Sequence, residues 1–575
     1  MEYKEKDDNG GTSVQPAYAP PAYAPDAGSD PEKAYRVDHT GTTMPGMNLN
    51  NRGEMEGGVK RSLKQRHMAM IAIGGAIGTG LFVGSGGALA NGGPVGVWLA
   101  YCIMASMVFS MMVALGEMAT LFPVAGAFTH YAARFVDPAL GFAVGFNYWY
   151  SWAITTPTEL VASAIVISYW DSKTNPAVYI TVTMVLVWLV NFFGARAYGE
   201  CEFWFSAIKV VTIVGLIILG LVLMCGGGPS HDAIGFRYWR NPGPFNQIAA
   251  GDGVIGGRWG QFLAFFSVFT QAAFSFIGTE IVATTLGEAQ NPRRTVPRAI
   301  KRVFYRLVIF YVLGIFFISV LVPYTDSRLL DASGAGTAKA SPFVIAIENA
   351  GIKGLPSVVN AVILVSAWSA GNSDVYAASR TLYALSLQGQ APRFFRYCLK
   401  NGLPIWCIVV TSLFGALAYL NTGGDAAVQA FNWLYNISAI SGILAWWAIL
   451  LSYLRFYYGL KRQGLSRDSH PYKAPFQPYL SWYGIISFTI IMLFNNFGVF
   501  LKGNWKASNF VASYITIPIF AVCWVGWKLL KRTKLVPLDQ IDFVSGRRQL
   551  DEMEEMDKEI YAPETWYQRL SSYLF

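Results

Sequence analysis

Long apolar runs alternate with short polar segments over most of this chain of 575 residues. A helix needs about 20 mostly apolar residues to cross ~30 Å of hydrocarbon. Runs of that length recur from Met68 to Leu530, far more often than buried helices do in a soluble protein. The pattern predicts an all-α polytopic membrane protein with twelve transmembrane helices, at 68–90, 95–117, 139–169, 177–194, 203–225, 260–285, 303–323, 356–386, 404–420, 428–455, 482–501 and 509–530.

Basic residues in the polar segments predict the orientation. They cluster before the first span, after span six in "NPRRTVPRAIKRVFYR", between spans ten and eleven, and after the last span. All four clusters fall on one side if both termini do, and the positive-inside rule makes that side cytoplasmic. The expected organisation is a disordered cytosolic N-terminal tail (1–66), a twelve-span domain (67–530) and a cytosolic C-terminal tail (531–575). The polar N-terminus predicts no signal peptide.

Composition narrows the class of function. Charged residues make up 14% of the chain, against roughly 25% in an average soluble protein. The net charge of +9 is explained by the basic loops, so no nucleic-acid partner is expected. Six cysteines and five histidines are scattered without disulfide or metal-ligand spacing. No ATP-binding loop or nucleophile–base pair is visible, so neither an enzyme nor a cofactor is predicted.

The first span contains the glycine-rich stretch "IAIGGAIGTGLFVG", Ile71 to Gly84. Each glycine inside a helix costs about 1 kcal/mol relative to alanine. Close helix packing is one interpretation, because the glycines have small-xxx-small spacing. A phosphate-binding loop is excluded, since no Gly-Lys-Ser/Thr follows. The third interpretation is an unwound helix whose free backbone groups bind a small ligand.

Span six has a second glycine interruption, Gly278-Thr279 in "FSFIGTEIV". Paired interrupted helices in two repeated halves indicate a transporter binding site near the membrane midplane. Helix N-termini offer N–H donors to a carboxylate, and helix C-termini offer carbonyls to an ammonium. A zwitterionic α-amino acid matches both.

The chain resembles the fungal amino-acid permeases of the amino acid–polyamine–organocation superfamily, from about Lys60 to the C-terminus. The resemblance is carried by "LKQRHMAMIAIGGAIGTGLFVGSG", "GEMATLFPVAGAFTHYAARFVDPALGFAVGFNYWYSWAI", "EFWFSAIKVVTIVG", "SFIGTEIVATTLGEAQNPRRTVPRAIK" and "SAGNSDVYAASRTLYALSLQGQAP". It implies a five-plus-five inverted repeat with broken spans one and six, two extra helices, and proton-coupled amino-acid import at the plasma membrane. A non-transporting amino-acid sensor on the same fold is the alternative.

The resemblance also implies the substrate-binding residues. The backbone and hydroxyl around Gly78, Thr79 and Gly80 would bind the carboxylate. Carbonyls near Ala76, Phe274 and Ile277, beside Gly278, would bind the ammonium, and Phe274 would close over the substrate. Side-chain selection is expected from spans three, eight and ten. The loop "GGGPSHDAIGFRYWRNPGPFNQ" resembles that of dicarboxylic permeases, so the range is expected to be broad or dicarboxylic.

Charged residues inside apolar runs are functional candidates, because each costs about 2.5–3.5 kcal/mol at a helix centre. Glu117 lies near a cytoplasmic end, where pairing with loop arginines is the simpler role. Glu159 is either a buried structural hydrogen bonder or functional. Glu280 follows the break in span six and would brace the unwound strand or take part in proton traffic. Asp374 lies in span eight.

Lys209 in span five has two interpretations. A lysine near a helix end can lift its ammonium to the interface. The resemblance instead places it beside the inner half of span one, where sodium-driven relatives hold a sodium ion. Desolvation disfavours a charged ammonium, so this lysine would release and regain the coupling proton.

The N-terminal tail contains Pro20-Pro21-Ala22-Tyr23, a PPxY sequence. Proline-rich segments dock into the aromatic grooves of WW domains. This pattern predicts recruitment of a WW-domain ubiquitin ligase through Pro20, Pro21 and Tyr23. A low-complexity repeat without a partner is the alternative.

Overall fold

In the computed structural model, the described residues are 70, 77–122, 126–251, 253–281, 303–329, 341–399, 401–422, 425–470 and 472–544. All of those from 49 onward belong to one unit, Leu49–Phe575. The predicted N-terminal tail with Pro20, Pro21 and Tyr23 lies outside the described residues, as do Ala76 and the C-terminal tail beyond 544.

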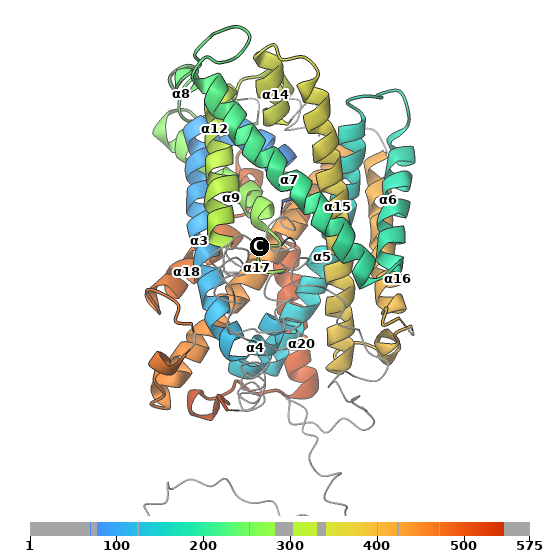
Figure 1. Ribbon diagram of the computed structural model, residues 1–575. Coiled ribbons are helices and arrows are strands. Elements are labelled where there is room, and N and C mark those ends of the chain that lie inside the picture. Colours follow the sequence, from blue (N-terminus) through green and yellow to red (C-terminus); the bar gives the residue numbers. More distant parts are fainter. Residues whose placement is uncertain are drawn as a thin grey trace, which may run out of the picture. The chain divides into compact units, whose positions relative to one another are not determined.

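Helices dominate the described residues (Figure 1). Five are long and apolar enough to cross a membrane: α3 (Pro94–Leu121), α7 (Ala195–Met224), the helix Val303–Leu321, which contains a π-helical stretch (Leu307–Leu313) and α12 (Gly314–Leu321), α15 (Leu355–Leu387) and α17 (Asp425–Arg462). A sixth candidate is the pair α19 (Ala507–Tyr514) and α20 (Thr516–Lys531), bent by 46°. The polytopic helical class is therefore confirmed, whereas the twelve spans and the repeat remain predictions.

The remaining helices are shorter or less apolar. Those that correspond to predicted spans are α5 (Pro138–Ile167), α6 (Pro176–Phe192), α9 (Gly257–Phe276), α16 (Ile405–Leu413) with a 3₁₀ extension to Thr422, and α18 (Tyr479–Leu493). In the first predicted span, a π-helical turn (Gly80–Gly84) leads into α2 (Ser85–Gly92). Three short helices were not predicted: α4 (Ala127–Phe135), α8 (Arg237–Arg240) and α14 (Pro342–Asn349). They have too few apolar residues to stand out as spans. Strands β1 (Ala249–Ala250) and β2 (Gly253–Val254) pair antiparallel, Ala249 opposite Val254.

Helix starts follow local chemistry. Asp137 precedes α5 and accepts a hydrogen bond from the Ala139 N–H, with Pro138 at the first helical position. Asn175 and Pro176 start α6 in the same way. A polar N-cap followed by proline satisfies one orphan donor and removes another. These signals placed both helices to within a residue or two of the predicted spans.

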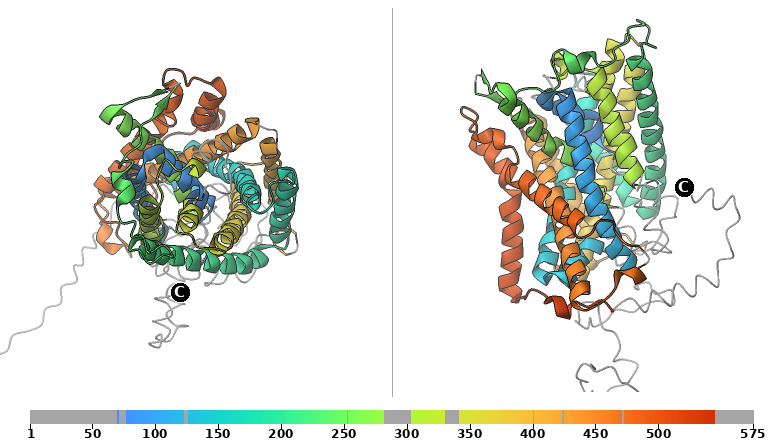
Figure 2. Two further views of the ribbon diagram at one scale, coloured as in Figure 1. Left: turned by 90° about the horizontal axis from the view of Figure 1, so that it is seen from above. Right: turned by 90° about the vertical axis from the view of Figure 1, so that its left-hand side faces the viewer.

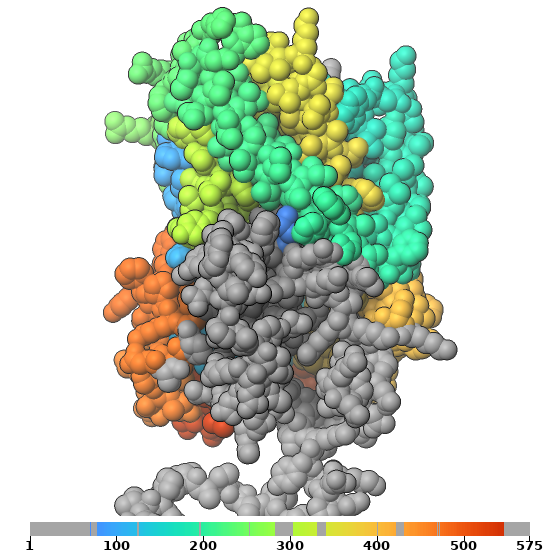
Figure 3. All heavy atoms as spheres, viewed as in Figure 1, coloured from blue at the N-terminus to red at the C-terminus, as the bar shows by residue number. Residues whose placement is uncertain are grey.

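The helices pack around α5, which contacts α15, α17 and α20. Seen from above, α2 and α9 lie side by side within the bundle (Figure 2). Helix α7 crosses α12 and α15 obliquely (Figure 1). Its outward face is apolar, with Trp204, Val211 and Ile218 exposed, and part of α7 is visible on the surface in the space-filling view (Figure 3). This face suits contact with lipid chains.

A C-terminal strap, residues 532–544, runs along the bundle end that carries α4. The Val536 N–H donates to the Val136 carbonyl, and the Gln463 amide donates to the carbonyls of Leu538 and Ile541. Arg134 pairs with Asp542 at 3.3 Å. These contacts join the strap to the start of α5 and the end of α17.

Candidate functional site

The chain enters its first described membrane helix inside the bundle. Ile77 and Thr79 are buried, and the π-helical turn begins at Gly80. The Ile77 carbonyl accepts a 3.0 Å hydrogen bond from Ser366 of α15. A helix that starts here presents N–H groups to the protein interior. The described residues therefore have a buried helix start at the predicted position, and the interruption of the first span stays a prediction, because residues 71–76 lie outside the described ones.

Glu159 of α5 lies at this helix start. Its Oε1 accepts a 2.9 Å hydrogen bond from the Thr79 hydroxyl, and the Thr79 peptide is a second donor to the same carboxylate. Oε2 of Glu159 has no hydrogen-bond partner among the described residues. A side-chain carboxylate therefore already accepts hydrogen bonds from Thr79, one of the residues predicted to bind a substrate carboxylate.

The predicted glycines Gly78 and Gly80 are required by space. A Cβ added at Gly80 would lie 2.8 Å from Ser275 Cα, and one added at Gly78 would lie 3.0 Å from Glu159 Oε1. Neither glycine has a positive φ, whereas Gly278 has φ +89°. Close packing therefore explains Gly78 and Gly80, and backbone conformation explains Gly278.

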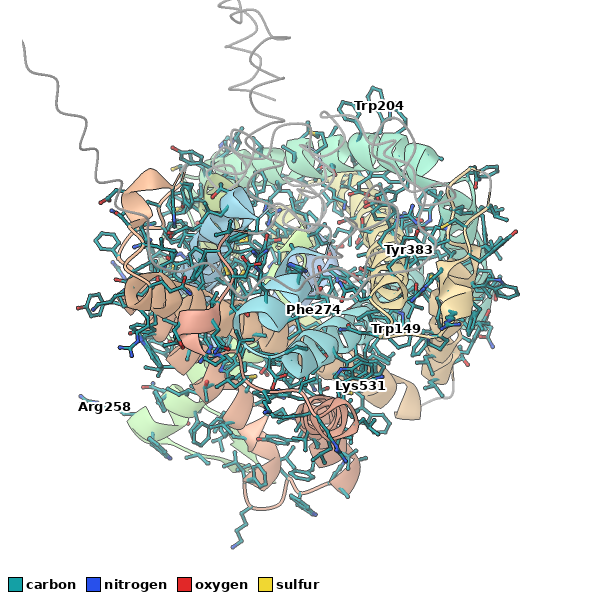
Figure 4. The ribbon with its side chains drawn as sticks, turned by 90° about the horizontal axis from the view of Figure 1, so that it is seen from below. Trp149, Trp204, Arg258, Phe274, Tyr383 and Lys531 are labelled. Carbon is teal, nitrogen blue, oxygen red and sulfur yellow. The ribbon has the colours of Figure 1, made fainter. Side chains whose placement is uncertain are left out.

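The predicted second interruption falls at the end of α9. The helix ends at Phe276, Ile277 leaves the helical region with ψ 143°, and Gly278 continues the turn. Phe274 packs on Tyr435 of α17, with ring centroids 4.0 Å apart, and lies in the middle of the bundle (Figure 4). Trp204 lies at the rim of the same view and points outward. Both helix ends meet in the interior, because Gly80 packs directly on Ser275.

Glu280 is buried immediately after this turn. Its Oε2 accepts a 2.9 Å hydrogen bond from the Trp446 indole of α17. The Gly278 peptide also hydrogen-bonds the carboxylate. These contacts favour the bracing role that was one of the two predicted for Glu280, because the side chain ties the turn to α17.

Lys209 is 0% exposed, so its ammonium does not reach the membrane interface. Its Nζ lies 3.7 Å from Oε1 of Glu202, which stands seven positions earlier on the same helix, α7. Glu202 in turn accepts hydrogen bonds from Ser206 at 3.1 Å and from Ser369 of α15 at 2.5 Å. Snorkelling, the simpler interpretation of Lys209, is wrong for this structure.

Two predicted acids join this lysine. Glu159 and Asp374 both act electrostatically on Lys209 and on each other. The structure thus gathers Lys209, Glu159 and Asp374 from spans five, three and eight. Sequence reasoning missed Glu202, although its spacing of seven residues from Lys209 puts both on one helix face.

Glu117 lies apart from this group. It accepts hydrogen bonds from Arg467 at 2.6 and 2.8 Å, from the Tyr453 hydroxyl and from the Ala474 N–H, and His470 Nδ1 lies 3.2 Å away. Pairing with a loop arginine, the simpler prediction for Glu117, is confirmed.

The comparisons with known proteins settle the family. Residues 67–539 match the model of the family described as "Amino acid permease". The chain belongs to the amino acid permease family. It is a multi-pass transport protein and not an enzyme, as the sequence predicted.

Several fungal proteins resemble this permease over most of their length. A lysine-specific permease of Saccharomyces cerevisiae is 46% identical over 86% of this chain and 79% of its own. A dicarboxylic amino acid permease of the same yeast is 42% identical over 86% of this chain and 81% of its own. A proline-specific permease of Emericella nidulans is 42% identical over 90% of this chain and 93% of its own. Relatives of similar identity thus carry different substrate names.

Proposed function

We propose that this protein imports amino acids across the plasma membrane by proton symport, with both termini in the cytoplasm. The observation that carries the proposal is the contact between two buried helix ends, the start at Gly80 and the end at Phe276, through Gly80 and Ser275. The N–H end of one helix and the carbonyl end of the other therefore lie close together, as a zwitterion requires.

In this proposal the substrate carboxylate binds at Gly78, Thr79 and Gly80, and its ammonium binds the carbonyls near Phe274 and Ile277. Glu159 shares the Thr79 donors with the substrate. Phe274, packed on Tyr435, closes the site. Lys209 with the surrounding carboxylates forms the coupling element.

The charges of the described site favour neutral or cationic amino acids over dicarboxylic ones. Glu159, Glu202 and Asp374 surround Lys209, and a second substrate carboxylate would be repelled by this excess of acids. The relatives named lysine-specific and proline-specific agree with this preference, whereas the relative named dicarboxylic, which is as similar as the proline-specific one, does not. The dicarboxylic range suggested by one loop is the less favoured alternative.

Uptake of radiolabelled amino acids into proteoliposomes tests the function, with a panel of neutral, basic and acidic competitors. The proposal predicts sodium-independent accumulation that an inward proton gradient drives and a protonophore collapses. A sensor would bind amino acids without moving them. Strong competition by glutamate and aspartate alone would reverse the proposed substrate preference without changing the transport function.

A further inference from the structure

Asp374 is a buried acid without a hydrogen-bond donor for one of its oxygens. Asp374 lies on α15 and is 2% exposed. Its Oδ2 has no hydrogen-bond partner among the described residues. The titratable groups that act on it are Glu159 from α5, and Lys209, Glu202 and Tyr198 from α7. Within the described part of the chain, this cluster holds three carboxyl groups and one ammonium.

The ammonium already has a counter-ion. Glu202 lies 3.7 Å from Lys209 Nζ and is held by two serine hydroxyls, which stabilise a carboxylate. Moving an ion out of water is costly even after the protein relaxes, unless a partner of opposite charge compensates it. One lysine therefore compensates Glu202, and Glu159 and Asp374 cannot both remain charged without another cation.

Hydrogen bonds separate the two remaining acids. The Thr79 hydroxyl and peptide donate to Glu159, and donors favour the carboxylate form. No described group donates to Asp374 Oδ2. A proton that enters the cluster is therefore held best at Asp374.

We propose that Asp374 carries the coupling proton, while Lys209, paired with Glu202, is a fixed positive charge. The inference rests on the proposed proton symport and names its carrier. A proton from the outer water binds Oδ2 and forms a neutral carboxylic acid. The same O–H bond breaks on the cytoplasmic side, the proton passes to water there, and the carboxylate is restored. Lys209 keeps its protons throughout.

The position of Asp374 on α15 explains how its charge influences the proposed substrate site. Ala370 lies one turn away on the same face of α15, and a Cβ added at Gly78 would lie 3.3 Å from Ala370 Cβ. On the same helix, Ser366 holds the Ile77 carbonyl. Neutralising Asp374 also weakens its repulsion of Glu159, the acid that shares Thr79 with the substrate.

The test compares the full-length wild type with Asp374→Asn in proteoliposomes. Two quantities are measured: accumulation driven by an imposed proton gradient, and exchange of external for internal labelled substrate. The ratio of the first to the second is expected to fall by about tenfold or more in Asp374→Asn, within the range of ordinary coupling free energies. A pH dye inside the vesicles should also lose its substrate-induced acidification. Asp232→Asn, an exposed carboxylate paired with Arg237, is the control and should match the wild type.

The possible outcomes distinguish a failure of the Asp374 proposal from a failure of the proposed proton symport. An unchanged ratio and unchanged acidification in Asp374→Asn would overturn the inference and leave proton symport standing. A wild type that ignores the proton gradient would overturn both. If Asp374→Asn does not fold, Asp374→Glu decides, since it keeps a carboxyl group: normal coupling supports the carrier role, and lost coupling with normal exchange contradicts it.

Discussion

The Thr79 hydroxyl donates a 2.9 Å hydrogen bond to Glu159 Oε1, and these residues are 80 positions apart in sequence. The bond joins the buried helix start of the first span to α5 and brings an acid into the proposed substrate site. A buried carboxylate is thereby held by the same donors that the substrate is proposed to use.

Thr79→Ala is expected to raise the KM for uptake by about two- to tenfold, because a net hydrogen bond contributes about 0.5–1.5 kcal/mol. The maximal rate should change less, since the backbone donors remain. Concentration-dependent initial rates measure both. Thr183→Ala is the matched control, because this buried threonine bonds only carbonyls of its own helix. Equal KM values in both variants would argue against a substrate role for Thr79.

Gly80→Val is expected to abolish uptake in protein that still reaches the plasma membrane. The new Cβ would lie 2.8 Å from Ser275 Cα, and backbone cannot move aside as a flexible side chain can. Gly78→Val should act similarly through Glu159 and Ala370. Gly215→Val on α7 is the control, since nothing lies within 4 Å of its added Cβ. Near-normal uptake by surface-localised Gly80→Val would contradict the contact between the two helix ends.

Lys209→Ala is expected to lose accumulation against a gradient, because the Glu202 carboxylate is then left buried without its cation. Lys209→Arg separates two roles. Arginine does not deprotonate in proteins, so it cannot replace a lysine that releases the coupling proton. With Asp374 as the carrier, arginine should keep part of the proton-driven accumulation. Complete loss of coupling with normal exchange in Lys209→Arg would return the carrier role to the lysine.

Glu117→Gln is expected to lower the stability of the detergent-solubilised protein while the KM of the surviving fraction stays unchanged. Breaking a buried ion pair by removing one partner costs about 3–5 kcal/mol, and Glu117 is buried against Arg467. Thermal unfolding monitored by fluorescence measures the effect. Asp468→Asn in the same loop is the control, because its pair with Lys473 is exposed and exposed ion pairs contribute little to stability. A stable Glu117→Gln with an altered KM would instead point to a transport role.

The double substitution Pro21→Ala, Tyr23→Ala is expected to reduce ubiquitination and internalisation of the permease, because it removes the PPxY sequence that WW domains bind. Microscopy of a fluorescently tagged chain after substrate addition measures internalisation. Tyr18→Ala is the control, since the neighbouring Gln-Pro-Ala-Tyr lacks the first proline of the motif. Identical internalisation in all three proteins would rule out this use of the tail.

The sequence by itself determined the helices and most of the polar residues inside them. Apolar length predicted α3, α5, α6 and α15 to within a few residues, because the hydrocarbon thickness fixes how many residues a span needs. Isolated charges in apolar runs identified Lys209, Glu159 and Asp374, because such charges are too costly to retain without a role or a partner.

Only the tertiary structure decided which of these residues meet. The sequence singled out Gly80 but not its partner, and only the structure shows that Ser275 packs against it. Glu202 stands at the start of an apolar run and was not identified from the sequence. Its hydrogen-bond donor Ser369 lies 167 positions away. The short helices α4 and α14 were also missed, because with 9 and 8 residues they lack the apolar length of a span. Local patterns determine where a helix forms. Contacts between residues distant in sequence are determined by packing, which single-residue propensities do not predict.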